Sequence, residues 1–265
     1  MSQALSIFLA SATVAVLLAQ DGALPGGDIL PIPTEGHSLP PISGEALIAE
    51  GLDRLPLEPL VMTGRIIMRG PKGIISKQFR FDVFVEWGAE PPIAVYKIFD
   101  MKGNLLETVT AKAGNALSLT PPSLTRVLPG SDAESSPPWN ERVQDTDVTW
   151  LDVTLGFLWW QNPTLVGKTE KVKGRLCDIV DLFPPIPVPN CAKARVWLDR
   201  EVKLLMQAEE ISPAGKTNRK LWVRAVKKIR DRWMVRDLEV ETHGTKQRTR
   251  LHIEDVVEQE KADCE

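Results

Sequence analysis

Strict alternation of apolar and polar residues is the sequence feature that most constrains the fold of this chain. In QFRFDVFVEW, residues 78–87, an apolar side chain occupies every second position from Phe79 to Trp87. Successive side chains of a β-strand point to opposite faces. This period-two pattern therefore predicts an antiparallel strand with one face toward a core and the other toward water.

Similar segments recur along the chain, mostly separated by the turn-forming residues Gly, Asn, Asp or Pro. They are LVMTGRIIMR, PIAVYKIFD, NLLETVTA, RLCDIVDLF, ARVWLDR, KLLMQAEEIS, RKLWVRAVKKI, WMVRDLEVET and TRLHIEDVV. So many short strands with few helices predict a mainly β (α+β) chain with one curved antiparallel sheet, open or partly closed. Between Pro121 and Asn140, a stretch rich in Pro and Ser predicts a long loop between two groups of strands, or a lid.

The N-terminal part of the chain indicates export. Residues 4–19 form an uncharged, largely apolar run that suits a secretory signal peptide and is short for a spanning helix, which needs ~20 residues. A short uncleaved anchor or a misplaced start codon is the alternative. We expect a signal peptide over 1–20, a Pro/Gly-rich linker over 21–44, a folded domain over 45–258 and a polar tail over 259–265.

Two helices are predicted among the strands. The first has Ser43 as its N-cap and an apolar stripe that includes Leu47, Ile48 and Leu52. The second lies in TDVTWLDVTLGFLWW, residues 146–160, where Asp147 suits an N-cap and apolar residues follow at helical spacing. Asp147 and Asp152 are five positions apart, so they do not share a helix face as a catalytic pair would. Asp152 then lies toward solvent or bonds back to the sheet.

The overall charge argues against nucleic acid as a partner, because the net charge at pH 7 is −3. One local run, RKLWVRAVKKIRDRWMVRD at residues 219–237, carries eight basic residues. The strand pattern of its neighbours favours a solvated strand face for this run. Contact with anionic lipid head groups is the alternative.

The sequence shows no recognisable pattern of an enzyme, a cofactor site or a metal site. His37, His243 and His252 are scattered, and neither G-x-S-x-G nor H-E-x-x-H occurs. A lipid hydrolase would need a Ser or Asp beside His252. Cys177 and Cys191 either form a disulfide across a hairpin or are buried small apolar residues, and they lack the spacing of zinc ligands.

The order of these segments resembles the outer-membrane lipoprotein-sorting proteins of the LolA/LolB-like superfamily. The similar pieces are VMTGRIIMR, QFRFDVFVEW, VYKIFDMKGNLL, TDVTWLDV and VWLDREVKLLMQAEEISPAGK, within roughly residues 47–257. The resemblance implies an unclosed half-barrel with helices over its concave face and an apolar cavity between them. It also implies a periplasmic carrier or chaperone for lipoprotein acyl chains or another lipid, with envelope membranes as partners.

Large apolar side chains independently favour a lipid carrier over an enzyme. Eight Trp against one Tyr suit a roomy apolar cavity, and each buried methylene group contributes about 0.8 kcal/mol to binding. We expect a monomer without a cofactor. The alternative is a non-enzymatic envelope domain that binds protein and has a filled core. The predicted lipid-cavity residues are Phe81, Phe84, Tyr96, Trp150, Trp159, Trp197, Met206 and Trp222.

Overall fold

The computed structural model describes residues 43–113, 123–160, 162–229 and 232–258. The first group of strands comprises β1 (Leu60–Arg69), β2 (Ile75–Glu86), β3 (Ile93–Phe99), β4 (Leu105–Lys112), β5 (Ser123–Val127) and β6 (Glu134–Ser135). The second comprises β7 (Thr164–Val172), β8 (Arg175–Leu182), β9 (Lys193–Asp199), β10 (Leu205–Ile211), β11 (Thr217–Ile229), β12 (Arg232–Thr242) and β13 (Arg248–Glu258). The helices are α1 (Gly44–Leu52) and α2 (Trp150–Thr154), with short 3₁₀ turns at Pro71–Gly73, Val143–Asp145 and Gly156–Trp159.

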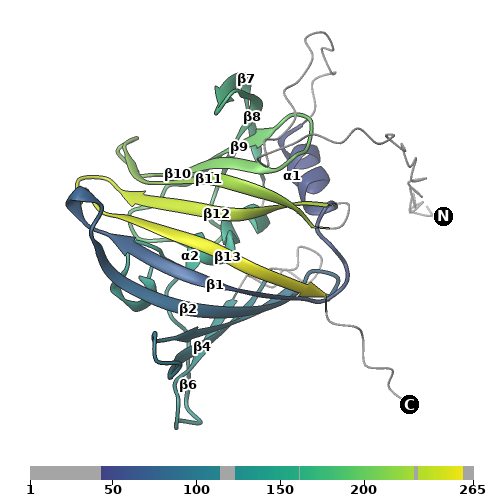
Figure 1. Cartoon of the computed structure of the whole chain (residues 1–265). Coiled ribbons are helices and arrows are strands. Elements are labelled where there is room, and N and C mark those ends of the chain that lie inside the picture. The colour runs from purple at the N-terminus through teal and green to yellow at the C-terminus, as the bar shows by residue number, and fades with distance from the viewer. Residues whose placement is uncertain (1–42, 114–122, 161, 230–231, 259–265) are drawn as a thin grey trace, which may run out of the picture.

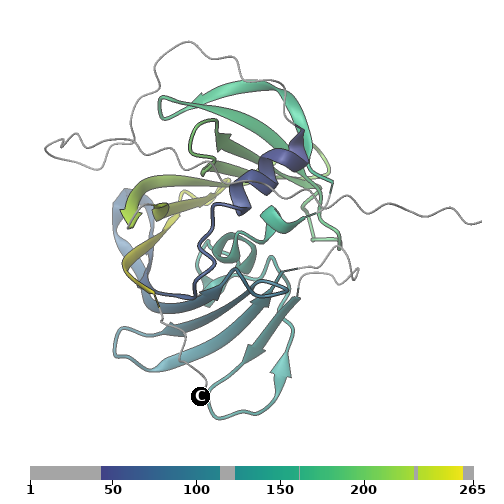
Figure 2. The same ribbon diagram turned by 90° about the vertical axis from the view of Figure 1, so that its right-hand side faces the viewer.

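These strands form one 13-stranded sheet in the order β6-β5-β4-β3-β2-β1-β13-β12-β11-β10-β9-β8-β7. Each half is a meander of antiparallel neighbours, and the pairing of β1 with β13 joins the first strand to the last. The sheet curves around α2 (Figure 1), while α1 crosses between its two halves (Figure 2). In the described part of the chain, β6 and β7 remain separate edges, so the predicted unclosed half-barrel is confirmed.

The concave face of the sheet carries the main core. On β2, Phe81, Val83 and Val85 are buried there, as the alternation predicts. Gly64 of β1 is opposite Phe81, and a Cβ at this glycine would lie 2.2 Å from the carbonyl oxygen of His252 and 2.6 Å from the Phe81 ring. Glycine is therefore required here for the close approach of ring and backbone.

The stretch predicted as a long loop between Pro121 and Asn140 is partly strand. β5 pairs with β4, and the two-residue β6 pairs with β5, so both extend the sheet past its fourth strand. Pro121 itself lies outside the described residues. Strands of five and two residues are too short for a period-two pattern to be recognised within a Pro-rich stretch.

The second strand group also buries apolar residues on its convex face. Cys177, Ile179, Trp197 and Met206 form a separate cluster there, covered by side chains of β7. The indole Nε1 of Trp197 donates to Glu170 of β7 at 3.0 Å. Side chains of the edge strand β7 therefore help to shield this outer cluster from water.

The two described cysteines lie on opposite faces of the sheet. Cys177 belongs to the convex cluster and Cys191 to the concave core, and both are buried and free. The disulfide alternative is therefore not formed in the structure. Burial raises the pKa of each thiol to about 12, which keeps both protonated and unreactive at neutral pH.

Helix α1 begins as predicted. The Ser43 hydroxyl accepts a hydrogen bond from the backbone N–H of Ala46 at 3.2 Å, and Leu47 and Ile48 are buried in the core. At the other end, Asp53 is the C-cap, and its N–H donates to the carbonyl of Ala49. The cap and the apolar stripe together orient α1 over the concave face.

The second helix starts later than predicted. Residues 146–160, which we call the plug, contain α2, and its N-cap is Thr149 instead of Asp147. The Asp152 carboxylate accepts the Thr149 backbone N–H at 2.8 Å, while the Thr149 hydroxyl accepts the Asp152 N–H at 3.4 Å. This capping box outcompetes the aspartate two residues upstream. Leu155 has a left-handed φ of 49°, which ends α2 after five residues.

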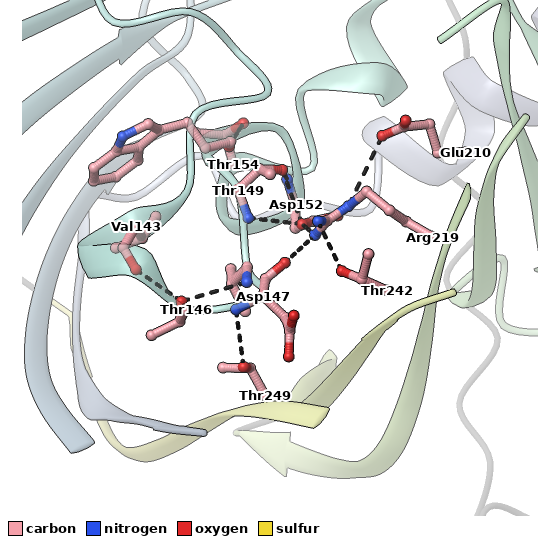
Figure 3. A network of polar contacts seen from close by, with 12 residues as sticks. Val143, Thr146, Asp147, Thr149, Asp152, Thr154, Glu210, Arg219, Thr242 and Thr249 are labelled. Atoms are coloured by element: carbon pink, nitrogen blue, oxygen red, sulfur yellow. Dashed lines mark hydrogen bonds and ion pairs between the residues drawn. The ribbon is translucent and has the colours of Figure 1, made fainter. Parts of the chain in front are cut away.

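Arg219 of β11 joins the plug to the sheet (Figure 3). Its Nη2 donates to the Asp152 carboxylate and to the backbone carbonyl of Asp147, and its Nη1 donates to the Thr242 hydroxyl at 3.3 Å. The Thr249 hydroxyl accepts the Asp147 N–H at 3.2 Å. Asp152 thus bonds back to the sheet, one of its two predicted positions, and β11, β12 and β13 all hold the plug.

The Asp147 side chain is the unusual member of this group. It is fully buried, and within the described part of the chain neither carboxylate oxygen has a partner in good hydrogen-bond geometry. Burial raises the pKa of this carboxyl group, although the positive charges of Arg142 and Arg219 and the nearby Thr242 hydroxyl oppose the rise. The folded state therefore disfavours the ionised form of Asp147.

We expect Arg219→Met to lower the free energy of unfolding by about 3–5 kcal/mol, because it leaves the Asp152 carboxylate buried without its counter-ion. Urea denaturation followed by Trp fluorescence measures this loss. The matched control is Lys168→Met, whose partner Glu170 forms an exposed pair with side-chain accessibilities of 58% and 42%. An exposed pair contributes about 0–1 kcal/mol, so equal losses in the two variants would contradict the prediction.

We expect Asp147→Asn to stabilise the fold at neutral pH. Because the pKa of Asp147 is raised above its ordinary 3.8, the folded state holds this proton more tightly than the unfolded state does. The associated stability is present below pH 3.8 and is lost as the pH rises through the folded-state pKa. The gain in Tm from Asp147→Asn should be largest at neutral pH and shrink in acid. A neutral-pH Tm at or below that of the unmodified chain would refute it.

Candidate functional site

An apolar cavity of about 520 Å³ lies between the concave face of the sheet, the plug and α1. This volume is within the range of ~300–1,000 Å³ that is usual for small-molecule sites. The sheet contributes lining residues that include Met62, Val85, Trp87, Ala94, Tyr96, Trp233 and Ile253. The opposite wall includes Leu52, Trp139, Val153, Leu155, Leu158 and Trp159.

The cavity lies at the end of the sheet opposite the Arg219 network. Met62 is near the start of β1, and the lining residues Ile93 and Lys112 are paired where β3 begins and β4 ends. Arg219 and Thr242, in contrast, are paired beside the β10–β11 and β12–β13 turns. The plug is therefore fixed at one end of the half-barrel and leaves the space at the other.

The cavity walls are half-buried apolar side chains. Trp87, Trp139, Leu158, Trp233 and Met234 pack against the core on one side and face the cavity on the other. Wall atoms that face an empty space lack van der Waals partners there. An apolar ligand would supply these contacts and gain roughly 25 cal/mol for each Å² of apolar surface removed from water.

Tyr96 places a polar atom within this apolar wall. Its hydroxyl donates to the backbone carbonyl of Val153 in α2 at 3.4 Å, and its ring meets Trp150 edge to face with centroids 6.0 Å apart. Burial raises the pKa of the Tyr96 phenol above its usual value of 10.0. The group stays neutral, so it links the sheet to the plug without introducing charge.

Within the described ranges, four charged residues also line the cavity. Asp53 and Arg54 follow α1, Lys112 ends β4, and Lys203 lies in the turn between β9 and β10. Arg54 and Lys203 each lie 3.3 Å from a carboxylate oxygen of Glu50. The cavity thus combines a large apolar wall with a small group of charges.

The structure brings two of the eight predicted cavity residues into the lining, Tyr96 and Trp159. Phe81 and Trp150 are on the same side of the sheet but are packed in the filled core outside the lining. Trp197 and Met206 lie in the convex cluster.

Phe84 and Trp222 also lie on the convex side, since their strand neighbours Val83, Val85, Leu221 and Val223 are buried in the concave core. The Trp222 ring lies under the Arg248 guanidinium, 5.7 Å from the ring centroid. Period two separates two faces of a strand without identifying the concave one, which is why outward-facing aromatic residues entered the predicted set.

Several lining residues were missing from the sequence-based set. Trp87 was detectable, because it ends the alternating run on the same face as Phe81, Val83 and Val85. The sequence around Leu158 and Trp233 indicates a cavity position less clearly. Leu158 follows the early end of α2, and Trp233 lies in the basic run, which forms the β11–β12 hairpin.

The histidine that a hydrolase would need faces away from the cavity. His252 Nδ1 lies 2.6 Å from Asp237 Oδ1, and Arg250 Nη2 lies 2.7 Å from the other oxygen of the same carboxylate. The neighbours Leu251 and Ile253 face the core and the cavity, so His252 points to the convex side. Burial alone would raise the pKa of Asp237, but hydrogen bonds from Arg250 and His252 lower it. This arrangement is typical of a structural ion-pair network.

Within the described residues, no group of three or more His, Cys, Asp or Glu side chains is placed to hold a metal ion. A search of the same residues finds no helix with the length and hydropathy needed to cross a bilayer. The predicted signal peptide, residues 1–20, and the polar tail, residues 259–265, lie outside the described part of the chain.

Comparison with solved structures identifies the fold. A DUF1329 family protein from Desulfovibrio piger has 14% sequence identity and a TM-score of 0.69, covering 82% of this chain and 92% of that protein. A domain assigned as an outer-membrane lipoprotein-sorting protein from Vibrio parahaemolyticus has 15% identity and a TM-score of 0.69, with the same coverage. A LolA superfamily protein from Nitrosomonas europaea has 12% identity and a TM-score of 0.64, covering 83% of this chain and 95% of that protein.

These likenesses confirm the predicted resemblance at the level of the fold. No curated protein sequence matches the chain. A family model described as "Uncharacterized protein" matches residues 119–263, more than half of the 265 residues. The chain therefore belongs to the family that this model describes, and its fold is that of the LolA superfamily and DUF1329 domains.

Proposed function

We propose that this chain is a carrier that shelters acyl chains, of a lipoprotein or of another lipid, in its apolar cavity. The observation that supports this function most directly is the space of about 520 Å³ between sheet and plug, lined mainly by half-buried apolar side chains. A LolA-like half-barrel offers such a space on its concave side. The assignment of the similar Vibrio domain to lipoprotein sorting points in the same direction.

The chemistry of the wall fits acyl chains better than polar ligands. Wide apolar surfaces are provided by Trp87, Trp139, Trp159 and Trp233. The Tyr96 hydroxyl is hydrogen-bonded to the plug, at the carbonyl of Val153. Binding would then depend on buried methylene groups, each worth about 0.8 kcal/mol. Such a site binds tightly without tight control of chain length or branching, which suits a carrier of varied lipids.

The alternative, an envelope domain that binds protein, assumes a core filled by side chains. The unfilled space beneath the sheet favours the carrier over that alternative. Catalysis also has less support, because His252 is hydrogen-bonded to Asp237, which is ion-paired with Arg250, on the outer face away from the cavity. We propose a monomeric carrier of the periplasm, with residues 45–258 as its lipid-binding domain and membranes of the envelope as donor and acceptor.

Filling the cavity should reduce its capacity for lipid. Ala94 lies on the same face of β3 as Tyr96 and lines the space. Ala94→Trp should weaken uptake of a fluorescent fatty-acid probe by about tenfold or more, since excluding two methylene groups costs about 1.6 kcal/mol. Probe titration, followed by fluorescence, measures the change in Kd.

The matched control is Ala214→Trp, which adds the same side chain at an exposed turn between β10 and β11. This control should bind the probe as the unmodified chain does. Equal Kd values for Ala94→Trp and the unmodified chain, with both folded by circular dichroism, would argue against the cavity as the binding site. No uptake by the unmodified chain would argue against a carrier altogether.

The native cargo should accompany the protein through purification. Organic extraction of the full chain, expressed with residues 1–20 included and purified without detergent, should release an acyl lipid at close to molar equivalence, identified by mass spectrometry. Ala94→Trp purified in parallel should carry much less lipid, and Ala214→Trp an unchanged amount. Equal lipid on all three proteins would indicate adsorption outside the cavity.

A further inference from the structure

We propose that the cavity selects amphiphiles with an anionic head, and that Lys203 binds that head at the cavity wall. This inference rests on the proposed carrier function and adds the chemical class of its ligand. Lys203 lines the cavity, and its side chain is only 5% exposed. An ammonium group this buried requires an anionic or hydrogen-bonding partner.

The charges around Lys203 leave its ammonium group only partly compensated. Its Nζ lies 3.3 Å from Oε2 of Glu50, while Oε1 of the same carboxylate lies 3.3 Å from Arg54. The single Glu50 carboxylate is thus ion-paired with both Lys203 and Arg54, and both of these residues line the cavity. An ammonium group has three N–H donors, so Lys203 retains donors for a second anionic partner.

The other charged groups of the lining keep the balance positive. Lys112, at the end of β4, is exposed and has no ion pair in the described part of the chain, while Asp53 contributes one negative charge. The lining thus carries three positive charges, on Arg54, Lys112 and Lys203, against Asp53 in the lining and Glu50 beside it, an excess of one positive charge. A ligand with one anionic head would neutralise this excess, with its alkyl chain along the apolar wall.

The turn that carries Lys203 is held rigidly. Asp199 receives a bidentate interaction from Arg175, at 2.5 and 2.8 Å, and accepts the backbone N–H groups of Glu201 and Val202 at 2.9 and 2.8 Å. The Lys203 N–H donates to the Asp199 carbonyl at 3.0 Å. Because the backbone is held and the buried ammonium group is already paired with Glu50, Lys203 has less freedom to lose when a ligand binds.

Helix α1 packs directly on this turn. A Cβ at Gly51 would lie 3.3 Å from the Lys203 carbonyl oxygen, so glycine allows the close contact. Glu50, Arg54 and Lys203 thereby come together at the junction of α1 with the β9–β10 turn. Carboxylate and phosphate heads share the chemistry that this group would recognise, and charge-assisted hydrogen bonds to either are among the stronger ones in proteins.

The test is competition with a neutral fluorescent alkyl probe bound to the full chain. The competitors are an alkyl carboxylate, an alkyl phosphate and an alkyl alcohol of equal chain length, at low ionic strength and below their micelle concentrations. At least one anion should compete about tenfold better than the alcohol, given the strength of a hydrogen bond to a charged group. The two anionic arms distinguish a carboxylate head from a phosphate head.

Four variants assign this preference to Lys203. Lys203→Met should reduce the ratio of anion to alcohol affinity to near one, and Lys203→Arg should retain most of it. Glu50→Gln should increase the ratio, because it removes the competing carboxylate, whereas a merely structural ion pair would produce no such gain. Lys216→Met, at the exposed β10–β11 turn, is the matched control and should leave the ratio unchanged.

An unchanged ratio in Lys203→Met, or an alcohol that competes as well as both anions, would overturn the inference while leaving the carrier function intact. A ratio that falls equally in Lys216→Met would overturn the assignment to Lys203. Failure of the neutral probe to bind at all would instead count against the proposed function. The Lys203→Arg and Glu50→Gln results decide the matter even if Lys203→Met does not fold.

Discussion

A curved sheet of 13 strands has a wide concave apolar face, and this chain supplies little helix to cover it. In the described residues, α1 has nine residues and α2 has five. An apolar surface that has no packing partners and stays in contact with water gains neither dispersion energy nor hydrophobic stabilisation. The cavity is the direct result of this imbalance between sheet and helix, and a lipid is the kind of molecule that would correct it.

The location of the cavity follows from where the plug is anchored. Arg219 pairs with Asp152 and holds the backbone of Asp147 at the end of the sheet near the β10–β11 turn. Buried ion pairs are stable only when their geometry and hydrogen bonds compensate for lost hydration, so the plug has little freedom at that end. Nearer the cavity, the Tyr96 hydroxyl donates to the carbonyl of Val153 in α2, and the N–H groups of Trp150 and Leu151 donate to the carbonyls of Glu141 and Trp139. The half-barrel thus has a buried ion pair at one end and a mainly apolar cavity with a few charged residues at the other.

Much of this fold could be predicted from the sequence, because its elements have local signals. The alternation in QFRFDVFVEW predicts β2 and which of its residues share a face, though not which face is concave, and Ser43 marks the start of α1 correctly. The start of α2 was predicted wrongly at Asp147, since two capping residues lie within three positions and the choice between them depends on Asp152. β5 and β6 were not predicted as strands, because segments of five and two residues are too short to show a period-two pattern.

The site was harder to predict because it depends on long-range geometry. Trp197 and Trp159 are equally apolar, yet Trp197 lies beneath β7 on the convex face and Trp159 lines the cavity. Trp197 alternates with Val196 and Leu198, which are buried in the concave core, whereas Trp159 lies in the 3₁₀ turn after α2. The pattern around one tryptophan does not show which side of the sheet faces the cavity. The Glu50–Lys203 pair likewise joins residues that are far apart in the sequence.

An apolar wall and a fixed charge contribute differently to recognition. The affinity that buried methylene groups provide increases with the number of groups buried. It depends little on how the alkyl chain is branched or substituted. A buried cation favours an anionic head over a neutral one. A neutral head would give up its own hydration without neutralising the charge of Lys203. Asp199 and Arg175 fix the turn in which Lys203 lies, so the discrimination needs no rearrangement of the backbone. In the proposed carrier, the apolar wall would be permissive toward the tail of a lipid and Lys203 would be selective toward its head.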